Sequence, residues 1–233
     1  MSELSAADYR DKARAIIDSG IYDPDRIFQE LVRYYLINDP ETDWFYDTQD
    51  DMEELFDGLS DILGTNFSGQ PPGSAQETED AKRFRKVRNW VENVHYDSQG
   101  LLARNSPADQ TNPSRKFDGQ MDKVMHMIRA AAISAYVGET LADVASWGNE
   151  VVDMGKRQGQ LIGKRYGLYS GVIGSGYDQR DLQWGLYGSE LQNHFDLYSD
   201  KKARGLAKKF ANGTFLLSRW QDWYDASGKT LYD

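Results

Sequence analysis

The residues able to perform acid–base or metal chemistry are few and scattered in this chain. The three histidines, His95, His126 and His194, lie far apart in the sequence, and there is no cysteine. The lack of cysteine excludes thiol nucleophiles and cysteine-ligated metal sites. Two histidines could still share a metal ion, but an isolated histidine on a helix is more often a surface or capping residue.

Nucleophile and phosphate-binding motifs are also missing in their usual forms. The serines in Gly174-Ser175-Gly176 and Gly188-Ser189-Glu190 do not lie in a G-x-S-x-G frame. Neither a Walker A motif nor a G-x-G-x-x-G motif after a strand is found. We therefore expect a protein without enzymatic activity and without a cofactor, although a helical enzyme can hold a site that no short motif reveals.

One acidic stretch, residues 39–50, approximates a calcium-binding loop. Its carboxylates at template positions 1, 3, 5, 9 and 12 are Asp39, Glu41, Asp43, Asp47 and Asp50. Trp44 stands where the template requires glycine for a sharp turn, and an aspartate replaces the longer bidentate glutamate at position 12. The stretch is therefore a weak calcium candidate, and the alternative is an acidic loop between two helices.

Composition limits the class of protein and its partners. The chain has 233 residues and a formal net charge of -10, so it is long enough for one large domain or two small ones. Such an acidic chain has no general attraction to nucleic acid or to anionic membranes. No apolar run is long enough for a conventional transmembrane span, and the N-terminus has no signal-peptide pattern. We expect an intracellular or virion location.

Apolar residues recur at spacings of three and four along most of the chain, which predicts an all-α fold. The longest such segment, 117–173, is either one long helix or two helices in line. Proline, glycine and polar residues make 66–77 a predicted linker between an acidic helical segment, 1–65, and a main helical domain, 78–233. The other predicted helices cover about 5–20, 24–38, 48–64, 78–95, 179–197, 199–212 and 215–224.

A glycine at every fourth position distinguishes the end of the long segment. These glycines are Gly155, Gly159, Gly163, Gly167 and Gly171. On a helix they form a band about 160° wide, with Ile162, Tyr166 and Tyr169 beside one edge. A stripe without side chains lets another helix approach closely. We interpret it as a packing or oligomerisation face, within the chain or between copies. A glycine-rich loop and membrane insertion are the alternatives, and neighbouring lysines and arginines oppose insertion.

Charge is segregated along the chain. No lysine or arginine occurs between Arg33 and Lys82, and a basic block then follows. The block consists of Lys82, Arg83, Arg85, Lys86 and Arg88. A second cluster comprises Lys201, Lys202, Arg204, Lys208 and Lys209. Acidic and basic blocks could pair within the fold or head-to-tail between copies, and either basic cluster could instead contact nucleic acid phosphates.

These features favour a non-enzymatic structural protein that forms helix-packed homo-oligomers. Its expected partners are further copies of itself and other structural proteins. Phage virion components such as connector, neck and internal proteins share this general character, which is an analogy and not a family resemblance. Two alternatives stay open. One is a nucleic-acid-associated protein that uses its local basic patches. The other is a membrane-active delivery or ejection protein.

Overall fold

The computed structural model describes residues 4–38, 48–63, 73–75, 77–93, 121–138, 179–197 and 200–220. Within these ranges the chain forms seven α-helices and one 3-10 turn, without any strand, so the predicted all-α class is confirmed. The helices are α1 (Ala6–Asp18), α2 (Pro24–Asn38), α3 (Thr48–Leu63), α4 (Glu79–Asn93), α6 (Met121–Val137), α8 (Gln179–Leu197) and α9 (Asp200–Ala211), and the 3-10 turn is η2 (Leu217–Arg219).

Local sequence signals explain where several helices begin. Ser5 precedes α1, and its hydroxyl accepts a hydrogen bond from the Asp8 N–H while the Asp8 carboxylate accepts one from the Ser5 N–H. This capping box satisfies two donors that the first turn leaves without helical partners. α2 begins at Pro24, because a missing N–H costs nothing at the first helical position.

The predicted long segment is interrupted near its start. α6 ends at Val137, and Gly138 adopts a φ of 76°. The Gly138 N–H donates to the Ser134 carbonyl oxygen at 2.7 Å, which closes the last turn. The segment 117–173 is therefore not one continuous helix. Residues 139–173 lie outside the described residues.

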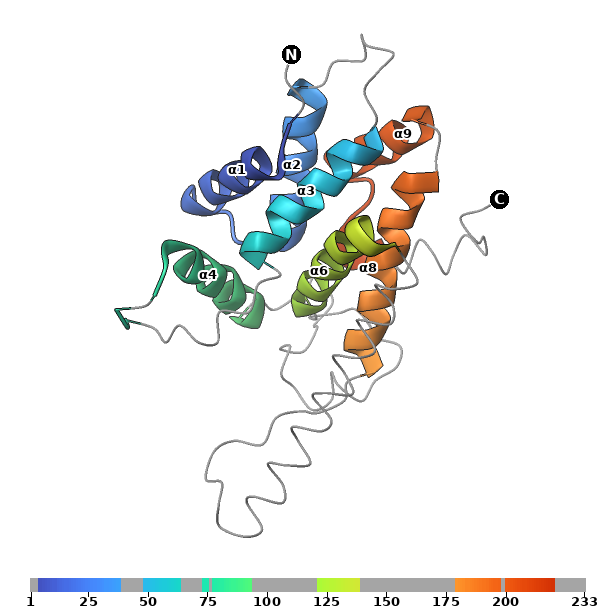
Figure 1. Ribbon diagram of the computed structural model, residues 1–233. Coiled ribbons are helices and arrows are strands. Elements are labelled where there is room, and N and C mark those ends of the chain that lie inside the picture. The colour runs from blue at the N-terminus through green and yellow to red at the C-terminus, as the bar shows by residue number, and fades with distance from the viewer. Residues whose placement is uncertain are drawn as a thin grey trace.

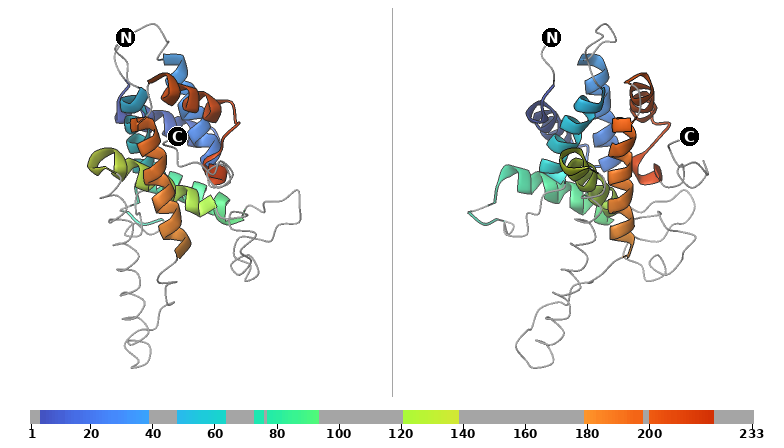
Figure 2. Two further views of the ribbon diagram at one scale, coloured as in Figure 1. Left: turned by 90° about the vertical axis from the view of Figure 1, so that its right-hand side faces the viewer. Right: turned by 45° about the vertical axis from the view of Figure 1, so that its right-hand side comes forward.

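The helices are arranged around α3, which crosses the middle of the bundle (Figure 1). α3 contacts each of the other described helices. α1 and α2 lie on one side of α3, and α6 and α8 cross each other on the other side. α9 lies at the edge of the bundle against α2, α3 and α8 (Figure 2).

One core joins the two ends of the chain. The Phe28 ring on α2 stacks on Phe56 of α3 at a centroid distance of 5.4 Å and meets Phe210 of α9 edge-on at 5.2 Å. Trp220, 1% exposed, stacks on Phe210. Residues from 1–65 and from 78–233 therefore share this core. The predicted linker at 66–77 lies mostly outside the described residues and stays a prediction.

Two glycines allow helices to cross at close range. A Cβ atom on Gly58 of α3 would lie 2.3 Å from the carbonyl oxygen of Ala6 on α1. A Cβ atom on Gly188 of α8 would lie 2.1 Å from the carbonyl oxygen of Met127 on α6. No side chain fits at such distances, so glycine is required for both crossings as they stand.

Candidate charged interaction surfaces

The residues predicted for oligomerisation cannot be placed. Gly155, Gly159, Gly163, Gly167 and Gly171, with Ile162, Tyr166 and Tyr169, all lie outside the described residues. So do four of the five calcium candidates, and the fifth, Asp50, is exposed in the first turn of α3. Both assignments stay predictions. Among the described residues, no three acidic or histidine side chains cluster as a metal site would need. None of the described helices combines the length and apolarity of a membrane span.

The basic block at 82–88 lies on α4, where Lys82, Arg83 and Arg85 pair with acids of the same chain. Lys82 Nζ lies 2.5 Å from Glu79 Oε1, one helical turn away. Arg85 pairs with Glu77. Arg83 bonds to two aspartates, as described below. The side chains of Lys86 and Arg88 are exposed. Much of the positive charge in this block is therefore already balanced within the fold.

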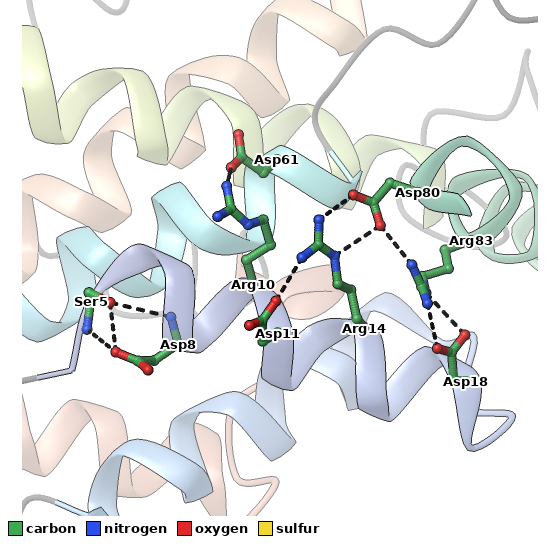
Figure 3. A network of polar contacts seen from close by, with 9 residues as sticks. All are labelled: Ser5, Asp8, Arg10, Asp11, Arg14, Asp18, Asp61, Asp80 and Arg83. Atoms are coloured by element: carbon green, nitrogen blue, oxygen red, sulfur yellow. Dashed lines mark hydrogen bonds and ion pairs between the residues drawn. The ribbon is translucent and has the colours of Figure 1, made fainter. Parts of the chain in front are cut away.

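Arg83 belongs to an ion network that joins α4 to α1 (Figure 3). Its guanidinium donates to Asp18 of α1 at 2.6 and 3.0 Å and to Asp80 at 2.8 Å. Arg14 of α1 donates to both oxygens of Asp80, at 3.0 and 2.5 Å. The hydrogen bond from Arg14 holds the pKa of Asp80 below its usual value, and Arg83 does the same for the pKa of Asp18. The centre of the basic block thus fastens one helix to another.

The second basic cluster lies on α9 and has two separate faces. Its four lysines are exposed, and we call them the lysine face: Lys201, Lys202, Lys208 and Lys209. They fall within about 120° around the helix. Gly205 lies in the middle of this arc, and a Cβ atom there would meet nothing within 4 Å. The opposite side of α9 is apolar and buried, with Leu206, Ala207 and Phe210.

The fifth basic residue of this cluster points inward and helps to hold α9 in place. Arg204 is 8% exposed, and its Nη1 donates to the Tyr35 hydroxyl at 3.1 Å. That hydroxyl donates to Thr48 Oγ1 at 3.0 Å. The Asp200 carboxylate accepts hydrogen bonds from the N–H and the hydroxyl of Thr48. At the other end of α9, Arg33 Nε donates to the Ala211 carbonyl oxygen at 2.7 Å. Hydrogen bonds to α2 and α3 thus hold both ends of α9, and the four lysines face outward.

α3 presents the opposite charge. This helix carries six acidic residues and no basic residue. Five of the six fall within about 100° around the helix, and we call them the acidic stripe: Asp50, Glu53, Glu54, Asp57 and Asp61. Three members have roles within the fold, and one of them, Asp57, is hydrogen-bonded with Tyr136 of α6. Glu54 Oε2 accepts the Ala6 N–H at 2.5 Å at the start of α1, and Asp61 pairs with Arg10 at 2.7 Å.

The negative charge of the stripe raises the pKa values of two residues, Glu53 and Tyr136. The pKa of Glu53 is raised by burial and by the nearby carboxylates of Asp196, Asp50 and Glu54. The pKa of Tyr136 on α6 is raised to about 12 by a hydrogen bond to Asp57, by burial and by the charges on the same stripe. Like charges are therefore crowded along this side of α3.

Two buried titratable groups are structural. Burial raises the pKa of Asp25 to about 6, although its carboxylate accepts the N–H and hydroxyl of Ser218 and so holds η2. Burial lowers the pKa of His194 to about 3. The His194 ring packs edge-on against Trp220 at 5.6 Å and is neutral at pH 7. Of the other histidines, His126 is exposed on α6, and His95 lies outside the described residues.

Comparison with protein-family models, with curated proteins and with solved structures finds no match to this chain. Its function is therefore inferred from the residues and their arrangement.

Proposed function

We propose that this chain is a non-enzymatic structural protein that assembles with further copies of itself through charged helix faces. The observation that carries the proposal is the lysine face of α9, four exposed lysines on a chain whose formal net charge is -10. Because the chain has more acidic than basic residues, each neighbouring copy carries acidic residues with which this basic face could pair. Complementary charge sets the register and orientation of such contacts and speeds encounter.

The strength of this contact follows from the exposure of the charges. An exposed ion pair contributes up to about 1 kcal/mol, and salt screens it. Four lysines therefore support a weak and reversible contact between two copies. In an assembly each copy makes more than one such contact, which raises the overall affinity. We expect association that grows with protein concentration and declines as salt rises.

Light scattering tests the proposal directly. We expect a mass above the 26.6 kDa of one chain at about 0.02 M salt and a lower mass at about 0.5 M salt. Lys201→Glu combined with Lys209→Glu should abolish the larger species. The matched control, Lys82→Glu with Lys86→Glu on α4, makes the same change in net charge and should leave the larger species intact. A monomer at every concentration and salt level would overturn the proposal, and loss of assembly in both variants would show that net charge alone acts.

The lysine face also favours a second function, contact with nucleic acid. Lys201 and Lys209 are separated by about 12 Å along the helix axis, a length over which a strand presents several phosphates. Binding would weaken steeply with salt, because each phosphate contact releases a counterion. Anisotropy of labelled DNA and RNA would reveal it. Loss of binding in the α9 variant but not in the α4 variant would support this function for the same face.

A further inference from the structure

We propose that the surface that receives the lysine face is the acidic stripe of α3 on a neighbouring copy. This inference rests on the proposed self-assembly and names its partner surface. The stripe is about 16 Å long and the lysine face about 12 Å long, from the helical rise between their first and last members. The stripe is therefore long enough to receive the whole lysine face, and its charge is opposite.

The acidic stripe, towards its N-terminal end, suits this role better than the acids of the ion network or Asp25, because at its other end Asp61 already pairs with Arg10. On α1 and α4, Asp11, Asp18 and Asp80 are already bound by arginines in the ion network. Asp25 is buried and bonded to Ser218. At the N-terminal end of the stripe, Asp50 is exposed. The carboxylates of Asp50, Glu54 and Asp196 repel the charge of Glu53 and raise its pKa. Lysines placed there would relieve the repulsion between like charges.

The geometry of one chain directs this contact to another copy. α9 packs on the bundle through its apolar side, with Leu206, Ala207 and Phe210 buried. The lysine face lies on the opposite side of the helix and so points away from the bundle to which α3 belongs. When each copy places its lysine face on one neighbour and its acidic stripe on another, the contact is heterologous and builds a ring or an open filament, whereas reciprocal pairing of two copies gives a two-fold dimer.

Charge exchange between two variants tests the inference. The first variant replaces all four lysines of the lysine face with glutamate, which turns four positive charges into four negative ones and makes both surfaces negative. The second is Asp50→Lys with Glu53→Lys and Asp57→Lys, which leaves three lysines beside Glu54 and Asp61 on the stripe and so makes both surfaces positive. Each variant alone should remain at the mass of a single chain. Mixed in equal amounts they should regain a larger mass, because every contact then joins opposite charges.

Controls separate the partner surface from the proposed function. Asp50→Asn with Glu53→Gln and Asp57→Asn removes three of the five charges of the stripe with little change in shape. This variant should weaken assembly even if the lysine substitutions disturb α3. Circular dichroism checks that each variant is folded. A wild-type protein that never assembles overturns both proposals. A wild-type protein that assembles, with a second variant that assembles equally well or a mixture that stays monomeric, overturns only the assignment of the acidic stripe.

Discussion

Replacing Gly188 with alanine should destabilise the fold, because α6 and α8 meet backbone against backbone at this point. The added Cβ would lie 2.1 Å from the Met127 carbonyl oxygen and 3.0 Å from the Ala130 Cβ, whereas ordinary contact begins at 3.4 Å. The nearest atom belongs to the backbone, so the two helices would have to separate by about 1.3 Å. Overpacking of this kind costs about 1–3 kcal/mol, and separation also loosens the surrounding core.

Gly205→Ala is the matched control, since it lies within a described helix where the new methyl group would meet nothing within 4 Å. Both substitutions gain about 1 kcal/mol of helix propensity. Their difference in the free energy of unfolding therefore isolates the steric cost, which we expect to be about 3 kcal/mol, the upper end of the overpacking range. Urea unfolding followed by circular dichroism measures both. Equal stability of the two variants would refute the close crossing.

Three further predictions concern other contacts in the fold. Gly58→Ala should lower the free energy of unfolding by about 2 kcal/mol, measured as above, because its Cβ also meets a backbone oxygen. In the Asp25→Asn variant, the free energy of unfolding should fall on acidification from pH 6 to about pH 4.5, by up to about 1.4 kcal/mol per pH unit. In the same range the free energy of unfolding of the wild type should change little, and that of the His194→Gln variant should rise. Asp80→Asn should cost about 1 kcal/mol at low salt, and less in about 1 M salt, where screening weakens the ion network; an unchanged loss at high salt would contradict this account.

The predicted pH dependence results from two opposed shifts. The folded-state pKa of His194, about 3, lies below the usual 6.5, so on acidification the unfolded chain takes up a proton first and the fold loses stability. The folded-state pKa of Asp25, about 6, lies above the usual 3.8, so the folded state takes up a proton first and gains stability. The two contributions nearly cancel between pH 6 and about pH 4.5. Parallel pH trends for the two single variants would refute this.

Several helix ends were predictable from the sequence because the interactions that set them are local, whereas at the helix predicted from residue 215 the described residues form a 3-10 turn at Leu217–Arg219. Ser5 and Asp8 are three residues apart, and Pro24 acts through its own ring. The predicted helix at 179–197 matches α8, and the predicted end of the next helix near residue 212 agrees with the end of α9 at Ala211. Periodic apolar residues likewise indicated an all-α fold without knowledge of any tertiary contact.

The partners of charged residues were not predictable in the same way. Arg83 binds Asp18, which is 65 residues away in the sequence, and no local pattern connects them. Arg204 stands among lysines in the sequence, yet its place around the helix turns it towards Tyr35. A helical projection of the sequence places Arg204 outside the arc of the four lysines, so its separate role could have been predicted from the sequence. Gly58 and Gly188 belong to no repeat, and their need for glycine depends on which helices cross there.

The central position of α3 determines how the protein opens. Because this helix contacts each of the other described helices, none of them can detach without uncovering part of it. Backbone amides in the middle of α3 should therefore exchange with solvent only when the entire structure unfolds, whereas amides near the exposed ends of the bundle exchange through local opening. A partner bound along α3 would then slow exchange throughout the molecule and not only beneath its own footprint.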